Sequence, residues 1–271
     1  MMFNPVVQTF KYAFSNVSLP FFETQFTGVD NFKRVLSMPE VGTIFKNTFF
    51  WIIGAVILRF SLGFAAALVM DGKSKLFKVM SVIAMLPWTV PSIVAANIWR
   101  WMLQSDFGLI NGTLRALGLG FMAANWLGSS RLAFSSVLVA YAWSGFPFVM
   151  LLLLSGMQGI PAVLYESGKI DGANSFQLFT HITIPSLKSV IFIAIILEAI
   201  NALNSFDLLY LLTGGGPGHS SEILGLFIYR LGFTDFDFAG ASAVSVVVFG
   251  IAALGFLLYA PTQFKKARKG E

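Results

Sequence analysis

The chain has 271 residues, of which 56% are hydrophobic and only 11% are charged, whereas about a quarter of the residues of a soluble domain are charged. This composition excludes an ordinary soluble domain and predicts an integral membrane protein. The absence of cysteine excludes disulfides and thiolate metal sites, and the net charge of +5 does not indicate a nucleic-acid partner, because the basic residues gather at the ends of apolar runs.

The first 22 residues contain neither a signal peptide nor a complete membrane span. They have no basic leader, and their apolar run is interrupted well short of the about 20 residues that a spanning helix needs. We expect residues 1–15 to form a helix near the outer membrane surface instead. Residues 23–43 are polar enough to be extracytoplasmic, so we expect residues 1–43 to form an N-terminal extracytoplasmic segment.

Five later apolar runs are long enough to cross a bilayer as helices, at about 44–70, 79–103, 132–157, 189–212 and 239–261. They predict an all-α polytopic membrane domain over residues 44–261, followed by a basic tail at 262–271. The second run contains Pro87 and Pro91, which membrane helices tolerate because neighbouring spans satisfy the freed carbonyl groups. A simple kink and a gating role are both open interpretations of these prolines.

The basic residues predict the orientation of the spans. Those of the loops around 71–78 and 158–188 and of the tail outnumber those of the opposite side, so these segments and the C-terminus are expected in the cytoplasm and the protein in the cell's cytoplasmic (inner) membrane. His181 and His219 then fall in different compartments, and no metal site is expected. Residues 71–74 resemble the end of a phosphate-binding loop, but Ala67 stands where that motif needs glycine, so no nucleotide cofactor is expected here.

The cytoplasmic loop 158–188 is predicted to hold two short helices joined by a tight turn. Pro161 fits the first turn of a helix, where its missing N–H costs nothing. Asp171 and Gly172 end that helix, because glycine accepts the left-handed backbone of a C-terminal cap. Residues 173–182 then form a second short helix that stops before Pro185.

This loop resembles the "EAA" loop of ABC-importer membrane subunits. Glu166, Gly172, Ile182 and Pro185 stand at the spacing of that motif, and Asp171-Gly172-Ala173 matches its form in the carbohydrate branch, the maltose and glycerol-3-phosphate type. Ser167 and Gly168 replace the two alanines of the motif. Both residues are small, although Gly168 costs about 1 kcal/mol of helix stability relative to alanine.

Shorter matches to the same family occur at residues 28–32, 107–111, 126–128 and 213–217, so the resemblance extends over residues 5–262. In that family an opening span leads into a stretch like residues 6–15. The resemblance therefore implies a maltose-permease-like helix bundle with five full transmembrane helices and an N-terminal remnant of a sixth. Either a first span precedes this sequence or the protein has none.

The resemblance also implies a function and a set of partners. The chain would be a permease subunit of a binding-protein-dependent ABC importer, without catalytic residues, embedded in membrane lipid. It would form half of the path for a sugar or related polar solute, together with a second permease. Two ATPase subunits, which bind ATP and Mg²⁺, would dock on the cytoplasmic side and couple to this chain through the EAA loop, and a solute-binding protein would dock outside. The expected ATPase-docking residues are Leu164, Tyr165, Glu166, Ser167, Gly168, Ile170, Asp171, Gly172, Ala173, Ile182 and Pro185.

A polar face on the fourth predicted span indicates a solute pathway. At about 100° per residue on a helix, Glu198, Asn201, Asn204 and Ser205 fall within an arc of roughly 120°. In the maltose-type permeases the third and fourth spans contact the sugar, and the resemblance adds Ser144, Gly145 and Phe148 of the third span. Phe148 is expected to stack on a sugar ring, and the amides are expected to bond its hydroxyl groups.

Arg59 lies near the middle of the first complete span, where a charge costs about 2.5–3.5 kcal/mol on insertion scales. We expect it to pair with Glu198, the acid that lies well inside another span. An arginine that extends to the membrane interface is the alternative.

Two alternatives to a sugar permease follow from the same residues. A glycerol-3-phosphate or phosphodiester importer would need cationic groups along the path. A secondary transporter would show an inverted repeat or a buried ion relay, and neither is visible in the sequence. A membrane enzyme would need a convergent acid, base or nucleophile set, which is not visible either.

Overall fold

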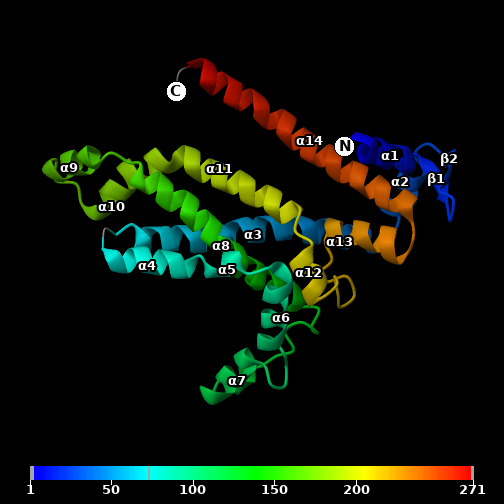
Figure 1. Ribbon diagram of the computed structural model, residues 1–271, viewed down its shortest axis with the longest axis horizontal. Helices are drawn as coiled ribbons and strands as arrows, with labels where there is room; N and C mark the ends of the chain where they lie inside the picture. The colour runs from blue at the N-terminus through cyan, green and yellow to red at the C-terminus, as the bar shows by residue number, and fades with distance from the viewer. Residues whose placement is uncertain (1–2, 73, 270–271) are drawn as a thin grey trace. The chain divides into compact units, whose positions relative to one another are not determined.

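The computed structural model describes residues 3–72 and 74–269, with side chains described up to residue 253. It divides into two compact units, one formed by the residues before Asn47 and after Ser221 and the other by Asn47–Ser221. Both are built almost entirely of helices (Figure 1). The expected all-α architecture is therefore confirmed, apart from one small β-hairpin in the first unit.

The N-terminal part of the first unit contains a short helix and this hairpin. Helix α1 (Phe3–Ala13) has 11 residues, too few to cross a bilayer, which agrees with the expected short helix. Strands β1 (Ser15–Ser18) and β2 (Glu23–Phe26) then pair in antiparallel fashion, with Ser15 opposite Phe26. The hairpin was not anticipated, and the placement of α1 at the outer membrane surface stays a prediction.

The first unit continues with α2 (Asp30–Leu36) and the start of α3 (Val41–Met70). It is completed by α13 (Leu224–Tyr229), a π-helical turn at Arg230–Thr234 and α14 (Phe238–Lys269). Its core packs Val35, Val41 and Ile44 against Phe227 and Leu231. The predicted span 239–261 lies within α14, and the helix continues into the predicted tail, whose side chains lie outside the described residues.

Arg230 connects three carboxylates in this unit. Its guanidinium lies 2.9 Å from Glu222, 3.0 Å from Glu40 and 3.4 Å from Asp235. Partial burial by itself would lower the pKa of Arg230, but the hydrogen bonds to Glu222 and Glu40 outweigh burial and raise that pKa. The permanently charged guanidinium thus links Glu222 and Asp235 to Glu40, the residue before α3.

The second unit holds most of the long helices. Between α3 and the end of the unit the chain forms α4 (Lys75–Ala84), α5 (Leu86–Thr89), α6 (Ser92–Met102), α7 (Leu109–Ala116), a 3₁₀ turn at Gly120–Met122, α8 (Ala133–Gln158), α9 (Ala162–Ile170), α10 (Ser175–Leu178), a π-helical turn at Phe179–Thr183, α11 (Ile184–Leu203) and α12 (Asp207–Leu212). Within the described part of the chain, three helices are long and apolar enough to cross a membrane, Val41–Met70, Ala133–Gln158 and Ser175–Leu203, or four with the bent pair described next.

The second predicted span is broken rather than kinked. The helical stretch Lys75–Thr89 and α6 meet at 94°. Val90 is extended, with φ −75° and ψ 125°, because the ring of Pro91 disfavours a helical residue before it. The expectation of one continuous helix over 79–103 is therefore wrong.

The fourth predicted span also has different bounds. A helix runs from Ser175 to Leu203, and Pro185 lies within it, as the second residue after a π-helical turn. The π-helical turn at 179–183 joins the two helical parts. A second short helix that stops before Pro185 is thus wrong, and so is a continuous span to 212, because the chain leaves the helix at residues 204–206.

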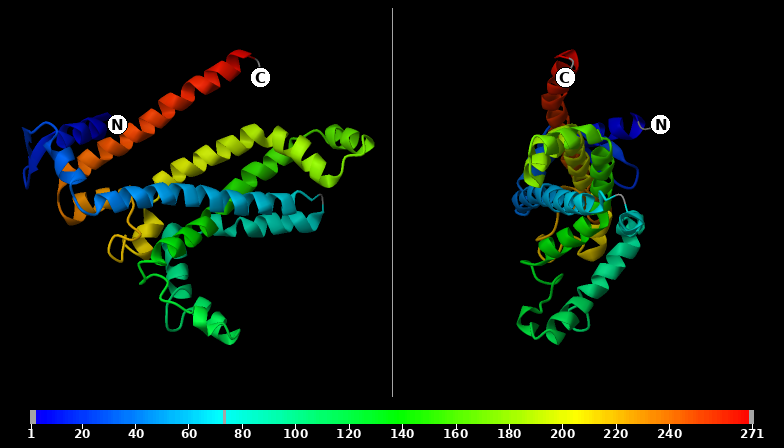
Figure 2. Two further views of the ribbon diagram at one scale, coloured as in Figure 1. Left: turned by 180° about the vertical axis from the view of Figure 1, so that it is seen from behind. Right: turned by 90° about the vertical axis from the view of Figure 1, so that its left-hand side faces the viewer.

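Helices α3 and α8 approach closely at Gly63, and α8 and α11 lie side by side (Figure 2). A Cβ on Gly63 would lie 2.7 Å from Cβ of Val149 and 2.8 Å from the Phe146 carbonyl oxygen. These atoms belong to the backbone or its first side-chain carbon, so the two helices would have to separate.

We therefore expect Gly63→Ala to lower the free energy of unfolding by about 1–3 kcal/mol, measured as a lower melting temperature of the detergent-purified protein. Gly54→Ala on the same helix is the control, because its Cβ would meet only the rotatable side chain of Leu138. Equal losses in the two variants would show that backbone contact at Gly63 is not the cause.

Candidate functional site

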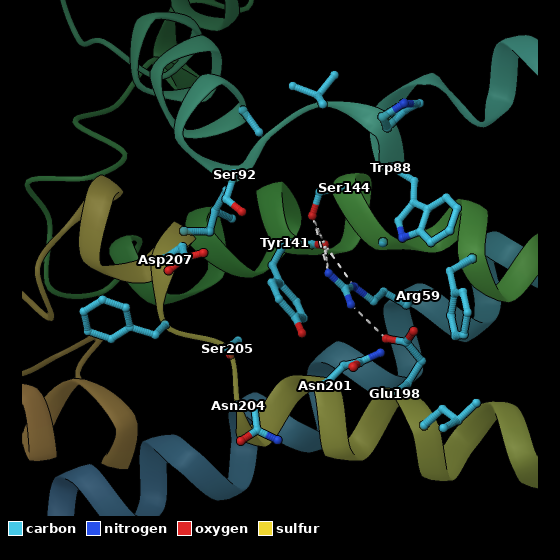
Figure 3. Close-up of a pocket in the computed structure, with 18 residues that line it drawn as sticks. Arg59, Trp88, Ser92, Tyr141, Ser144, Glu198, Asn201, Asn204, Ser205 and Asp207 are labelled. Carbon is cyan, nitrogen blue, oxygen red and sulfur yellow. Dashed lines mark hydrogen bonds and ion pairs between the residues drawn. The ribbon is translucent and has the colours of Figure 1, made fainter. Parts of the chain in front are cut away.

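A cavity of about 590 Å³ lies in the second unit, beside the two points where helices break (Figure 3). One break, at Val90 and Pro91, separates α5 from α6, and the other separates α11 from α12. The wall is completed by α3 and α8. Its polar lining consists of Arg59, Ser92, Tyr141, Ser144, Glu198, Asn201, Asn204, Ser205 and Asp207.

Arg59 and Glu198 form an ion pair in the wall of this cavity, as predicted from the sequence. Nη1 of Arg59 lies 2.9 Å from Oε2 of Glu198, and the side chains are only 8% and 1% exposed. Arg59 also donates to the backbone carbonyl of Tyr141, from Nε at 3.0 Å and from Nη2 at 2.8 Å. The guanidinium carbon lies 3.5 Å from the centre of the Tyr141 ring. The arginine is thus enclosed by protein and does not extend to an interface.

Gly145 provides the space for this arginine. A Cβ on Gly145 would collide with Cζ, Nε and Nη2 of Arg59. The other carboxylate oxygen of Glu198, Oε1, is buried and has no hydrogen-bond partner among the described residues. The pair therefore depends on a glycine from a third helix and leaves one acceptor unfilled.

Aromatic side chains cover two parts of the cavity wall. Trp88 of α5 lies 5.9 Å from Phe148 of α8, ring centre to ring centre, at 34°. Phe206, which also lines the cavity, stacks on Tyr210 at 5.1 Å, ring centre to ring centre. A second cavity of about 360 Å³ adjoins the first and shares Ser92, Phe206 and Asp207 with it.

The loop between α8 and α11 forms a helix, an elbow and a second helix. Gly172 has φ +82° at the elbow, as the sequence predicted for a left-handed position. Asn174 caps α10, because its side chain accepts from the Gln177 N–H while the Gln177 side chain accepts from the Asn174 N–H. The elbow and α10 line a shallow groove of about 320 Å³.

The packing of this loop explains why glycine replaces an alanine of the EAA motif at position 168. A Cβ on Gly168 would lie 2.6 Å from Cδ2 of Leu178 and 3.2 Å from Cδ1 of Ile182, so glycine lets the two helices pack closely. The Tyr165 hydroxyl bonds the Thr183 hydroxyl at 2.9 Å within the loop. Leu164 and Ile170 are exposed, Ile170 to 86%.

Residues 59–263 match the family described as the inner membrane component of binding-protein-dependent transport systems. The chain belongs to this family. It is 39% identical over 239 residues to the trehalose/maltose transport system permease protein MalF of Thermococcus litoralis, a match that covers 87% of this chain and 79% of that protein. It is 30% identical over 249 residues to the sulfoquinovosyl glycerol transport system permease protein SmoG of Agrobacterium fabrum, covering 92% and 80%.

Among solved structures, the permease resembles a chain of a bacterial ABC transporter that imports the acidic polysaccharide alginate. The TM-score is 0.84 with 21% identity, over 98% of this chain and 90% of that one, which establishes a shared fold. The recognition of an ABC-importer permease from its sequence is thereby confirmed. Members of this family are multi-pass components of the inner membrane rather than enzymes.

All seven residues predicted for the pathway of the permease line the cavity: Ser144, Gly145, Phe148, Glu198, Asn201, Asn204 and Ser205. Their contact with solute stays a proposal. The assumed helical arc is correct only for Glu198 and Asn201, since Asn204 and Ser205 lie in the break after α11. Ser205 is held there by Trp51, whose indole Nε1 donates to its hydroxyl at 2.7 Å.

Sequence reasoning missed ten lining residues of the permease, of which five are polar or aromatic: Trp88, Ser92, Tyr141, Phe206 and Asp207. Trp88 and Ser92 flank the break at Pro91, Asp207 begins α12, and Tyr141 lies one turn before Gly145 on α8. Pro87 and Pro91 were a signal for the first two, because membrane helices interrupted by proline line cavities. No signal in the sequence marked the break before Asp207.

Proposed function

We propose that the permease forms half of the translocation path for a neutral sugar or a related polar solute, and that the cavity between its broken helices contacts this solute. The side chains that line the cavity are the main support for this proposal. Hydroxyl and amide groups of Ser144, Asn201 and Asn204 suit sugar hydroxyls, while the Trp88 and Phe148 rings suit the apolar face of a pyranose. The volume of about 590 Å³ is within the about 300–1,000 Å³ typical of small-molecule sites.

The charges of the lining favour a neutral solute over a phosphate. Arg59 is the only cation among the lining residues that the structure describes, and Glu198 already neutralises it. Asp207 adds an unmatched acid to the same lining. This arrangement disfavours a glycerol-3-phosphate or phosphodiester solute, and membership of the binding-protein-dependent family argues against a secondary transporter.

The transport systems to which two relatives belong support a carbohydrate or carbohydrate-like solute. The Thermococcus litoralis protein belongs to a trehalose/maltose system and the Agrobacterium fabrum protein to a sulfoquinovosyl glycerol system. These solutes differ in charge and size. The relatives therefore favour carbohydrate-like solutes as a class, and the cavity lining is the basis for choosing among them.

We further propose that two ATPase subunits dock on the cytoplasmic side of the importer and that this chain couples to them through the loop 158–188, with this loop and the C-terminus in the cytoplasm. Exposed Leu164 and Ile170 would supply apolar contacts, and Glu166 a charge-assisted bond to an ATPase arginine. A second permease and a solute-binding protein complete the assembly. The alginate importer, which shares the fold, has been solved with its periplasmic protein.

The test of the solute path is Asn201→Ala in the complete transporter reconstituted in liposomes. We expect ATP-dependent uptake of radiolabelled maltose or trehalose to fall about tenfold, because a lost hydrogen bond of about 1.4 kcal/mol corresponds to that factor. Asn97→Ala is the control, since Asn97 is exposed on α6 outside the cavity lining and bonds only its own helix at Ile93. An equal effect of both substitutions, or none of Asn201→Ala, would contradict the proposal.

A further inference from the structure

The buried ion pair lies where three helices meet beside the cavity. Arg59 comes from α3, Glu198 from α11, and the carbonyl and ring of Tyr141 from α8. Figure 3 shows the guanidinium between the Tyr141 backbone and the Glu198 carboxylate. Both charged groups are part of the cavity wall, yet neither side chain is more than a tenth exposed. A solute in the cavity therefore passes a wall whose two charges cancel.

The geometry of this pair depends on Gly145. A side chain at that position would occupy the space of the guanidinium and force Arg59 away from Glu198. Gly145 thus leaves the space in which the guanidinium meets Glu198, although it carries no polar side chain itself.

We propose that Arg59, Glu198 and Gly145 together set the charge selectivity of the permease. Arg59 and Glu198 cancel each other's field in the cavity wall, so that neutral solutes are admitted and anionic ones gain no opposite charge there. This inference rests on the proposed function, because it assumes that solute passes through this cavity.

The inference predicts a defined change when one charge is removed. In Glu198→Gln the guanidinium of Arg59 remains without a counter-charge, and the cavity becomes attractive to anions. In the double variant Arg59→Gln, Glu198→Gln both buried charges are absent, so the lining has the net charge of the parent, which Asp207 sets. Asp207→Asn removes the same charge from an exposed residue of the same lining, where solvent and salt screen it, and is the matched control.

The absence of cysteine from the chain allows a direct measurement. A single cysteine at Asn201, one turn from Glu198 and about 5–6 Å away between Cβ atoms, reports the local potential. The complete transporter carrying this reporter is labelled with an anionic sulfonatoethyl methanethiosulfonate or a cationic trimethylammonium-ethyl one. The ratio of the anion rate to the cation rate is followed by mass spectrometry of this chain.

We expect Glu198→Gln to raise this ratio about tenfold, the effect of one unit charge at such a distance on two oppositely charged reagents. The double variant should return to within about twofold of the parent, and Asp207→Asn should change the ratio by less than about threefold. An unchanged ratio in Glu198→Gln, or an equal rise in Asp207→Asn, would overturn the proposal.

If the Glu198→Gln permease does not assemble into the transporter, the double variant Arg59→Gln, Glu198→Gln tests the proposal instead. The proposal expects the double variant to assemble, because it contains no uncompensated charge, and to keep the parental ratio. A double variant that also fails to assemble would overturn it. In uptake assays with maltose and a uronic-acid disaccharide, Glu198→Gln should shift the preference toward the uronate by about tenfold. Labelling that behaves as expected without any sugar uptake would contradict the proposed function, whereas normal sugar uptake with an unchanged labelling ratio would overturn the charge inference alone.

Discussion

Replacing Gly172 by valine is expected to uncouple the permease from its ATPase subunits. Gly172 has φ +82° and no atom within 4 Å of the position of a Cβ, so the effect comes from backbone strain and not from a collision. An ordinary residue costs about 1–2 kcal/mol in this region, and a β-branched residue is a stronger outlier there. The elbow should relax and move α9 away from the orientation that an ATPase would recognise.

The measurement is co-purification of the ATPase subunits together with solute-stimulated ATP hydrolysis in membranes. Gly172→Val should lose most of both while the permease still inserts at normal levels. Gly172→Asn is the control, because asparagine tolerates positive φ and should keep both. Normal coupling in the valine variant would contradict the docking role proposed for this loop.

Replacing Arg59 by alanine is expected to destabilise the permease by about 3–5 kcal/mol, because it leaves the carboxylate of Glu198 buried without its partner. The loss should appear as a strongly lowered melting temperature of the detergent-purified protein. It should also lower the amount of inserted protein.

The double variant Arg59→Met, Glu198→Met separates charge compensation from packing. Replacing a buried ion pair by apolar residues of similar volume is often nearly neutral, so this variant should recover most of the lost melting temperature. A double variant as unstable as Arg59→Ala would show that the charges of the pair do not determine its contribution.

The membrane class and the long regular helices could be derived from the sequence alone. The runs at 44–70 and 132–157 lie within three residues of α3 and α8, because an apolar stretch of about 20 residues has few other stable conformations in a bilayer. The pairing of Arg59 with Glu198 also followed, since a charge inside a span needs a partner and few candidates were available.

The tertiary structure alone decided where helices break and what surrounds the ion pair. Pro91 is compatible with either a kinked or a broken membrane helix, and the 94° break depends on which neighbours satisfy the freed backbone groups. The breaks bring Trp88 and Asp207 to the cavity that Glu198 and Asn201 already faced. That Gly145 provides the space for Arg59 could not be derived from the sequence, because steric fit between helices depends on their separation and rotation, which apolar runs of similar composition do not specify.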